Sequence, residues 1–144
     1  MWRFDSKLLC GLLLAFASAA EAADLQVKDA RLRLLPGDLP AAGYFTLTNV
    51  SGNAVALVGA ESAMFEQVMM HQSSIKDGVA SMDHVSQLEV APGATVAFAP
   101  GGYHLMLMKR QQPVSIGDEV TATLVFEDGQ RLPVTFKAVS PASQ

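Results

Sequence analysis

The chain has 144 residues, half of them hydrophobic, and a formal net charge of −4. This length predicts one domain with enough apolar side chains for a core that needs neither disulfides nor a structural metal. The sequence contains no basic stripe, so we expect no nucleic-acid partner.

The N-terminal segment has the three-part layout of a secretory signal peptide. Arg3 and Lys7 form a short basic start, an apolar run follows over Leu8–Ala17, and small residues then lead to Ala22. The pattern predicts that residues 1–22 are a signal peptide, cleaved after Ala22, and that the protein is exported. A membrane anchor is the alternative, but the apolar run is shorter than the about 20 residues that a span needs. We therefore expect no stable membrane insertion after cleavage.

Cleavage after Ala22 removes two basic and two acidic residues, so the net charge stays −4. It also removes Cys10, the only cysteine of the chain. A mature chain without thiols excludes disulfides, thiolate metal sites and cysteine nucleophiles. Lipid attachment at Cys10 is a further possibility. A lipid-modified cysteine should close the hydrophobic run, whereas apolar residues continue after Cys10, so we do not expect this modification.

Residues 23–139 have the pattern of an all-β domain, and residues 140–144 are expected to form a disordered tail. Short apolar-alternating runs are separated by Gly, Pro, Asn and Asp at spacings of about ten residues, which is typical of a Greek-key β-sandwich or barrel. No sustained helical period is present. We predict eight to ten short strands within the runs Leu25–Leu35, Tyr44–Val50, Ala54–Val58, Val68–Ile75, Val79–Val85, Leu88–Val90, Thr95–Phe98, Tyr103–Met108, Val120–Phe126 and Leu132–Val139.

Two Asp-Gly pairs, at residues 77–78 and 128–129, predict hairpins, because glycine accepts the positive φ that primed turns demand. If the turn at 77–78 has two residues, Ser73 opposes Met82 and His71 opposes His84. His71 and Met82 are then diagonal neighbours on one face, roughly 7–8 Å apart at Cα. A three-residue turn would shift the register by one and separate them.

The soft metal donors of the chain are concentrated in one region. All three histidines and most methionines lie between residues 69 and 108, namely Met69, Met70, His71, Met82, His84, His104, Met106 and Met108. Thioether sulfur and imidazole nitrogen together favour Cu(I). In a strand His104 and Met106 share one face, with Met108 behind them, while Leu105 and Leu107 face the core.

Each of these residues also has an ordinary structural explanation. Methionine fills irregular gaps in a core, and we expect this of Met64, Met69 and Met70. A histidine on a strand is commonly a surface or hydrogen-bonded residue. From residue chemistry alone, soft-metal binding and plain packing both remain open.

The spacing His71-x10-Met82-x21-His104-x-Met106 resembles the pattern of the PCu(A)C family of periplasmic copper chaperones. The segments 42–49 and 100–108 are also similar to that family, and the resemblance extends from Val27 to Val139. It implies a cupredoxin-like β-sandwich or barrel in the periplasm, with one Cu(I) per chain bound by these four residues. His84 is not part of the family pattern, and we expect it at the surface or behind the ligands.

The resemblance also implies a function in binding and transfer, without catalysis. The expected partners are a Sco-type thioredoxin-like protein and the copper-site subunit of cytochrome c oxidase, and the protein is expected to be a monomer. A metal-free periplasmic binding module is the main alternative. An electron-transfer cupredoxin would need a cysteine thiolate, which the mature chain lacks, and no nucleophile suggests a hydrolase.

Overall fold

The computed structural model describes residues 24–142; the predicted signal peptide, Cys10 and residues 143–144 lie outside them. Within residues 24–142 the chain forms ten strands and no helix, and so none that is long and apolar enough to cross a membrane. The predicted all-β class is therefore confirmed. The strands are β1 (Leu25–Arg33), β2 (Ala41–Asn49), β3 (Val55–Glu61), β4 (Phe65–Lys76), β5 (Val79–His84), β6 (Leu88–Val90), β7 (Thr95–Phe98), β8 (Tyr103–Arg110), β9 (Glu119–Phe126) and β10 (Arg131–Val139).

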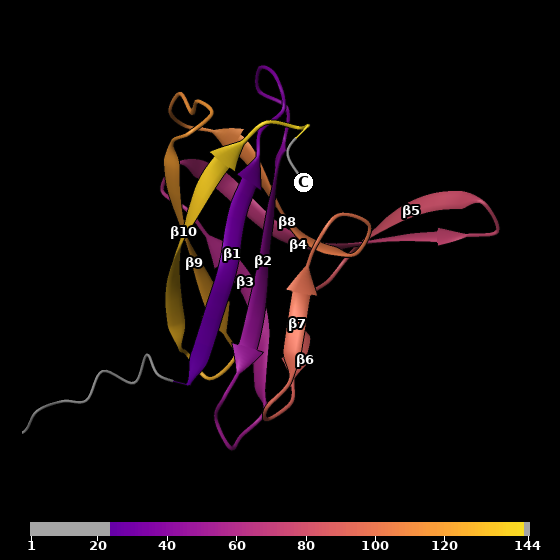
Figure 1. Cartoon of the computed structure of the whole chain (residues 1–144), viewed down its shortest axis with the longest axis vertical. Helices are drawn as coiled ribbons and strands as arrows, with labels where there is room; N and C mark the ends of the chain where they lie inside the picture. Colours follow the sequence, from indigo (N-terminus) through magenta and orange to yellow (C-terminus); the bar gives the residue numbers. More distant parts are fainter. Residues whose placement is uncertain (1–23, 143–144) are drawn as a thin grey trace, which may run out of the picture.

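The strands pair in the order β5-β4-β8-β7-β2-β1-β10-β9-β3-β6, and β8 also pairs directly with β2. The pairs β1–β10 and β7–β8 are parallel and the other pairs are antiparallel. Figure 1 shows these strands arranged around a common interior, from which the β4–β5 hairpin projects to one side. One end of the strand order therefore leaves the body as an arm.

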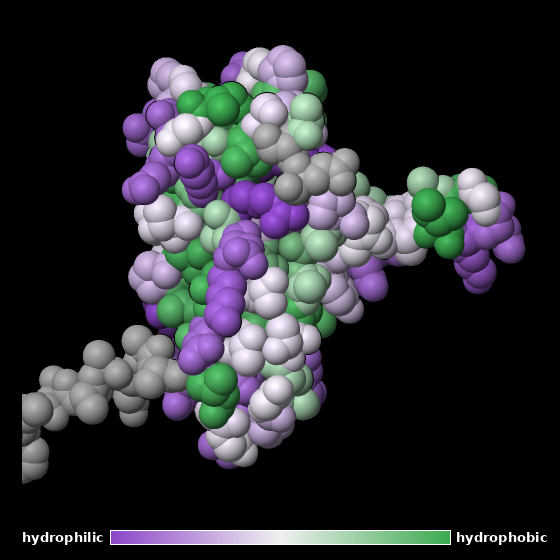
Figure 2. Space-filling view, viewed as in Figure 1, coloured by the Kyte–Doolittle hydropathy of each residue, from purple (hydrophilic) through white to green (hydrophobic). Residues whose placement is uncertain are grey.

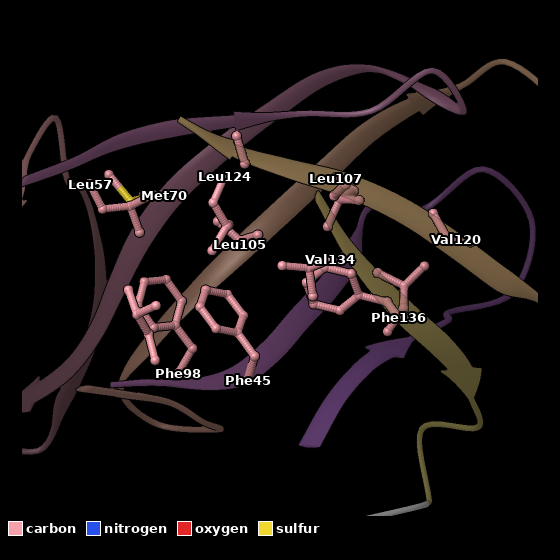
Figure 3. Packing of buried hydrophobic residues seen from close by; sticks show 14 of the residues in the cluster. Phe45, Leu57, Met70, Phe98, Leu105, Leu107, Val120, Leu124, Val134 and Phe136 are labelled. Carbon is pink, nitrogen blue, oxygen red and sulfur yellow. The ribbon is translucent and has the colours of Figure 1, made fainter. Parts of the chain in front are cut away.

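Aromatic and branched side chains fill the interior (Figure 3). The rings of Phe45 and Phe98 stack with centroids 4.3 Å apart, and Phe136 meets Phe45 edge-on at 5.9 Å. Leu105 and Leu107 of β8 are buried in this core, as their predicted inward direction requires. The outward face of the same strand is thereby fixed.

Strand β2 approaches β8 closely because residue 43 is a glycine. Gly43 is paired with Leu105, and a Cβ atom at residue 43 would lie 3.3 Å from the Cβ of Leu105. Such a contact is tighter than ordinary van der Waals packing. The absence of a side chain at Gly43 therefore sets how near β8 lies to the body of the protein.

The β4–β5 hairpin has the predicted two-residue turn. Asp77 and Gly78 have φ values of 53° and 77°, and a type I′ turn requires positive φ at both central residues. Ser73 is paired with Met82 and His71 with His84, so the predicted register is confirmed. All residues of β5 are exposed.

The second Asp-Gly hairpin forms with a longer turn than predicted. Only Gly129 has a positive φ there, of 92°, so this is not a primed two-residue turn. The Gly129 N–H donates to the carbonyl of Phe126 at 3.0 Å, and the Phe126 N–H donates to the carbonyl of Gln130 at 2.9 Å. The Asp128 carboxylate accepts the Gln130 N–H at 2.9 Å. This side-chain bond favours a longer turn over the two-residue form.

The core assignment predicts a large stability difference between two aliphatic positions. Leu105→Ala should lower the free energy of unfolding by about 2–5 kcal/mol, because it leaves a cavity in a packed core. The matched change Ile75→Ala, at a side chain that is 78% exposed on the hairpin, should change it by less than about 0.5 kcal/mol. Urea unfolding of both variants tests this, and similar losses would contradict the assignment.

Candidate metal site

Three histidines form a row across three neighbouring strands. His71 of β4 is paired with His84 of β5 on one side and with His104 of β8 on the other. The centroid of the His71 ring lies 6.0 Å from that of His84 and 5.7 Å from that of His104, with the rings nearly perpendicular in both cases. The strand register thus brings together residues that are far apart in the sequence.

Two methionines lie on the same face as this row. Met82 precedes His84 by two residues on β5, and Met106 follows His104 by two residues on β8. Residues i and i+2 of a strand share a face, so each flanking strand presents one His–Met pair beside His71. The four residues predicted from the spacing are therefore on one face of the three-stranded segment.

An open groove of about 330 Å³ lies where the hairpin leaves the body. Three of the four predicted residues line it, and His71 lies beside it, next to His104. Further lining residues, which sequence reasoning did not identify, come from β1, β2, β4 and two loops: Arg33, Leu35, Pro40, Ala41, Ala42, Tyr44, Ser73, Pro100 and Gly101. Ala42 reaches this place because β2 pairs it with Met106.

The candidate donors differ strongly in exposure. His104 is only 5% exposed, whereas Met82 on the hairpin is 51% exposed. His71 and Met106 are intermediate. The groove therefore has a closed inner side on β8 and an open outer side on β5.

Hydrogen bonding leaves ring nitrogens of two histidines available for a metal. Nδ1 of His104 lies 3.4 Å from the carbonyl oxygen of Gly102. In the tautomer that donates this bond, Nε2 keeps its lone pair, as in many metal-bound histidines. Nδ1 of His71 is buried and has no hydrogen-bond partner within residues 24–142. Buried polar atoms of this kind are rare and point to a ligand.

The surroundings of His71 favour its neutral form. Burial lowers the pKa of His71 below the ordinary value of 6.5, and the neighbouring His104 and His84 lower it further. Burial disfavours the charged ring, and nearby imidazolium groups would repel it. A neutral imidazole is the form that binds metal ions.

Nitrogen and carboxylate donors alone do not form a site here. Among residues 24–142, no group of three or more His, Cys, Asp or Glu side chains is arranged to hold a metal ion. Any metal bound in the groove must therefore use methionine sulfur. Thioethers favour soft ions such as Cu(I) over Zn²⁺, Mg²⁺ or Ca²⁺.

The remaining methionines divide between core and surface. Met70 is 2% exposed in the core and Met64 packs against it, as predicted. Met69 differs from the prediction. It is paired with Met106 on the face of the histidine row, and its sulfur accepts a hydrogen bond from Gln67 Nε2 at 3.4 Å. Met69 is two residues from His71, so strand alternation places it with the donors and opposite Met70.

Residues 25–138 match the family described as "Putative lipoprotein LpqE-like". The chain belongs to this family. A putative lipoprotein of Leifsonia xyli subsp. xyli is 30% identical over 115 residues, which cover 79% of this chain and 69% of the relative. An uncharacterized protein of Rickettsia prowazekii is 31% identical over 98 residues, which cover 67% of this chain and 54% of the relative. The LpqE-like chain thus spans only part of the length of these relatives.

Solved PCuAC domains have the same fold as this LpqE-like protein. The copper-bound PCuAC domain from PmoF2 superposes with a TM-score of 0.68 at 24% identity, over 82% of this chain and 94% of that domain. Cu(I)-bound DR1885 from Deinococcus radiodurans gives a TM-score of 0.66 at 30% identity, over 88% of this chain and 87% of that one. These matches confirm the predicted cupredoxin-like fold and the resemblance to PCu(A)C domains.

The lowered pKa of His71 predicts how the stability of the LpqE-like protein depends on pH. Since the folded pKa lies below the unfolded value of 6.5, the unfolded chain binds more protons, and stability falls as the pH drops from the unfolded to the folded pKa. Urea unfolding of the metal-free protein between about pH 7 and pH 5 should show a smaller loss for His71→Gln than for wild type. Identical losses would contradict the assigned pKa shift.

Proposed function

We propose that this LpqE-like protein is a periplasmic Cu(I) chaperone that carries one ion and transfers it to a partner. The observation that carries this proposal is the pair of His–Met sets that flank His71 on one face. The copper-bound PCuAC domain from PmoF2 and Cu(I)-bound DR1885 have the same fold and support it. Copper is the cargo, and the chain performs no chemical reaction on it.

The proposed ligands are His71, Met82, His104 and Met106. All four are neutral, so the bound ion keeps its single positive charge, and a second charge on the metal would receive no compensation from the ligands. Soft thioether donors add to this preference for Cu(I). Methionine sulfur also suits an oxidising compartment, because a thioether cannot form a disulfide.

The difference in exposure gives the site a direction for transfer. His104 and Met106 hold the ion from the inner side, while Met82 stands on the exposed hairpin arm with Ile75 nearby on the same face. Thiolates of a partner can therefore approach from the hairpin side and displace Met82 first. The inner ligands keep the ion bound until the partner has supplied its own donors.

The partners we propose are a Sco-type thioredoxin-like protein and the copper-site subunit of cytochrome c oxidase, which the resemblance to the PCu(A)C family implies. The chain would act as a monomer after export and removal of residues 1–22. The word "lipoprotein" in the names of the family and of the Leifsonia relative fits an exported protein.

A Cu(I) titration of the mature protein tests the proposal. Under anaerobic, reducing conditions and against a chromophoric Cu(I) chelator, the wild type should bind one equivalent. Met106→Ala should bind at least about tenfold more weakly, a loss of about 1.4 kcal/mol, because a groove ligand is removed.

Met70→Leu is the matched control, because this methionine is buried in the core and a Met-to-Leu change nearly conserves volume. Its affinity should equal that of the wild type. If the wild type fails to compete with the chelator, the chain is not a copper chaperone, and the metal-free binding module replaces this proposal.

A further inference from the structure

We propose that His84 forms, with His71 and Met82, an outer copper position that exchanges the ion with the inner ligands His104 and Met106. This inference rests on the proposed function. It assigns a role to a histidine that the spacing pattern leaves out. His84 would be an exchange ligand, used while the ion enters or leaves, and would not bind the ion in its resting position.

The spacing of the rings suits this role. A metal–nitrogen bond of about 2.0–2.1 Å places the centres of two imidazoles on one ion roughly 5–6 Å apart. The His71 ring lies 5.7 Å from that of His104 and 6.0 Å from that of His84. His71 is therefore spaced to share an ion with either neighbour.

The two flanking strands also present matching donor sets. Both β5 and β8 run antiparallel to β4, so they run parallel to each other. Along this common direction Met82 comes before the histidine row on β5, and Met106 comes after it on β8. The two His–Met sets are thus related by an approximate two-fold axis through His71. Each set offers one imidazole and one thioether to an ion beside His71.

Exposure distinguishes the two positions. His104 is 5% exposed, and the inner position is closed from the side of the core. His84 belongs to β5, where all residues are exposed. A partner or a chelator can reach an ion at the outer position directly, whereas an ion at the inner position must first lose ligands.

The exchange itself is a ligand substitution at constant oxidation state. The Cu–N bond to His84 forms while the Cu–S bond to Met106 and the Cu–N bond to His104 break. His71 and Met82 stay bound throughout, so the ion always keeps at least two protein ligands. The imidazoles are neutral before and after, so no proton or electron moves.

The first test measures transfer rate against affinity. Wild type and His84→Ala are loaded with one Cu(I) and mixed in a stopped-flow instrument with excess chromophoric chelator. His84→Ala should slow transfer by about tenfold and leave Kd within about twofold of the wild-type value. Ser81→Ala is the matched control, since Ser81 is an exposed residue of β5 on the opposite face, and it should change neither.

An unchanged transfer rate would overturn the proposal, and so would a tenfold loss of affinity, which would make His84 a ligand of the resting site. A wild type that binds no Cu(I) would instead refute the proposed function. The outcomes of the two proposals are therefore distinguishable.

The second test traps the ion at the outer position. His104→Gln should weaken Cu(I) binding but leave measurable affinity through His71, Met82 and His84. Adding His84→Ala to this variant should then remove at least about tenfold more, in contrast to its small effect in the wild type. Met106→Ala, at a partly exposed position, provides a second background if His104→Gln folds poorly. Equal affinities with and without His84 in both backgrounds would exclude the outer position.

Discussion

The candidate site depends on the register of β4 between β5 and β8. In this register His71 is opposite His84 and His104 at once, and the methionines lie diagonally to either side. A slip of one residue on either side of β4 would turn the donors of the flanking strand to the other face. Two features hold the register, the tight turn at Asp77 and Gly78 on one side and the buried alternation of β8 on the other.

Strand β8 serves the core and the site through the same alternation. Leu105 and Leu107 pack into the interior, and this burial points His104 and Met106 outward. Because a packed core resists displacement, the inner donors are held in place by interactions that have nothing to do with the metal. Gly43 adds to this, since β2 lies against β8 closely enough to place Ala42 beside Met106.

The sequence allowed prediction of the features that depend on local chemistry. Alternation and turn residues located all ten strands, although β4 begins at Phe65, earlier than the predicted Val68. The hairpin register followed from one Asp-Gly pair, whose two central residues have positive φ. The same signal misled at Asp128, where a side-chain hydrogen bond to Gln130 accompanies a longer turn.

Non-local pairing was beyond prediction from the pattern. Nothing in the sequence indicated that β8 pairs with β4 and β2 together, so the row of histidines and the groove beside Arg33 and Tyr44 were not expected. Arg33 and Arg31 place their guanidinium carbons 5.6 Å and 5.3 Å from the centre of the Tyr44 ring, and strand alternation alone does not show this. Met69 was assigned to the core by composition, whereas its face is set by its partner Met106.

A carrier must bind its ion firmly and still release it, and the fold separates these demands in space. The inner donors belong to a strand whose other face is buried, so their positions cost little entropy to maintain. The outer donors belong to an edge strand that projects from the body (Figure 1), and hydrophobic residues lie near its end (Figure 2). Such a strand has few packing contacts and opens more easily than the core. Since His71 contacts both regions, the strength of binding depends on the rigid side and the ease of release on the mobile one.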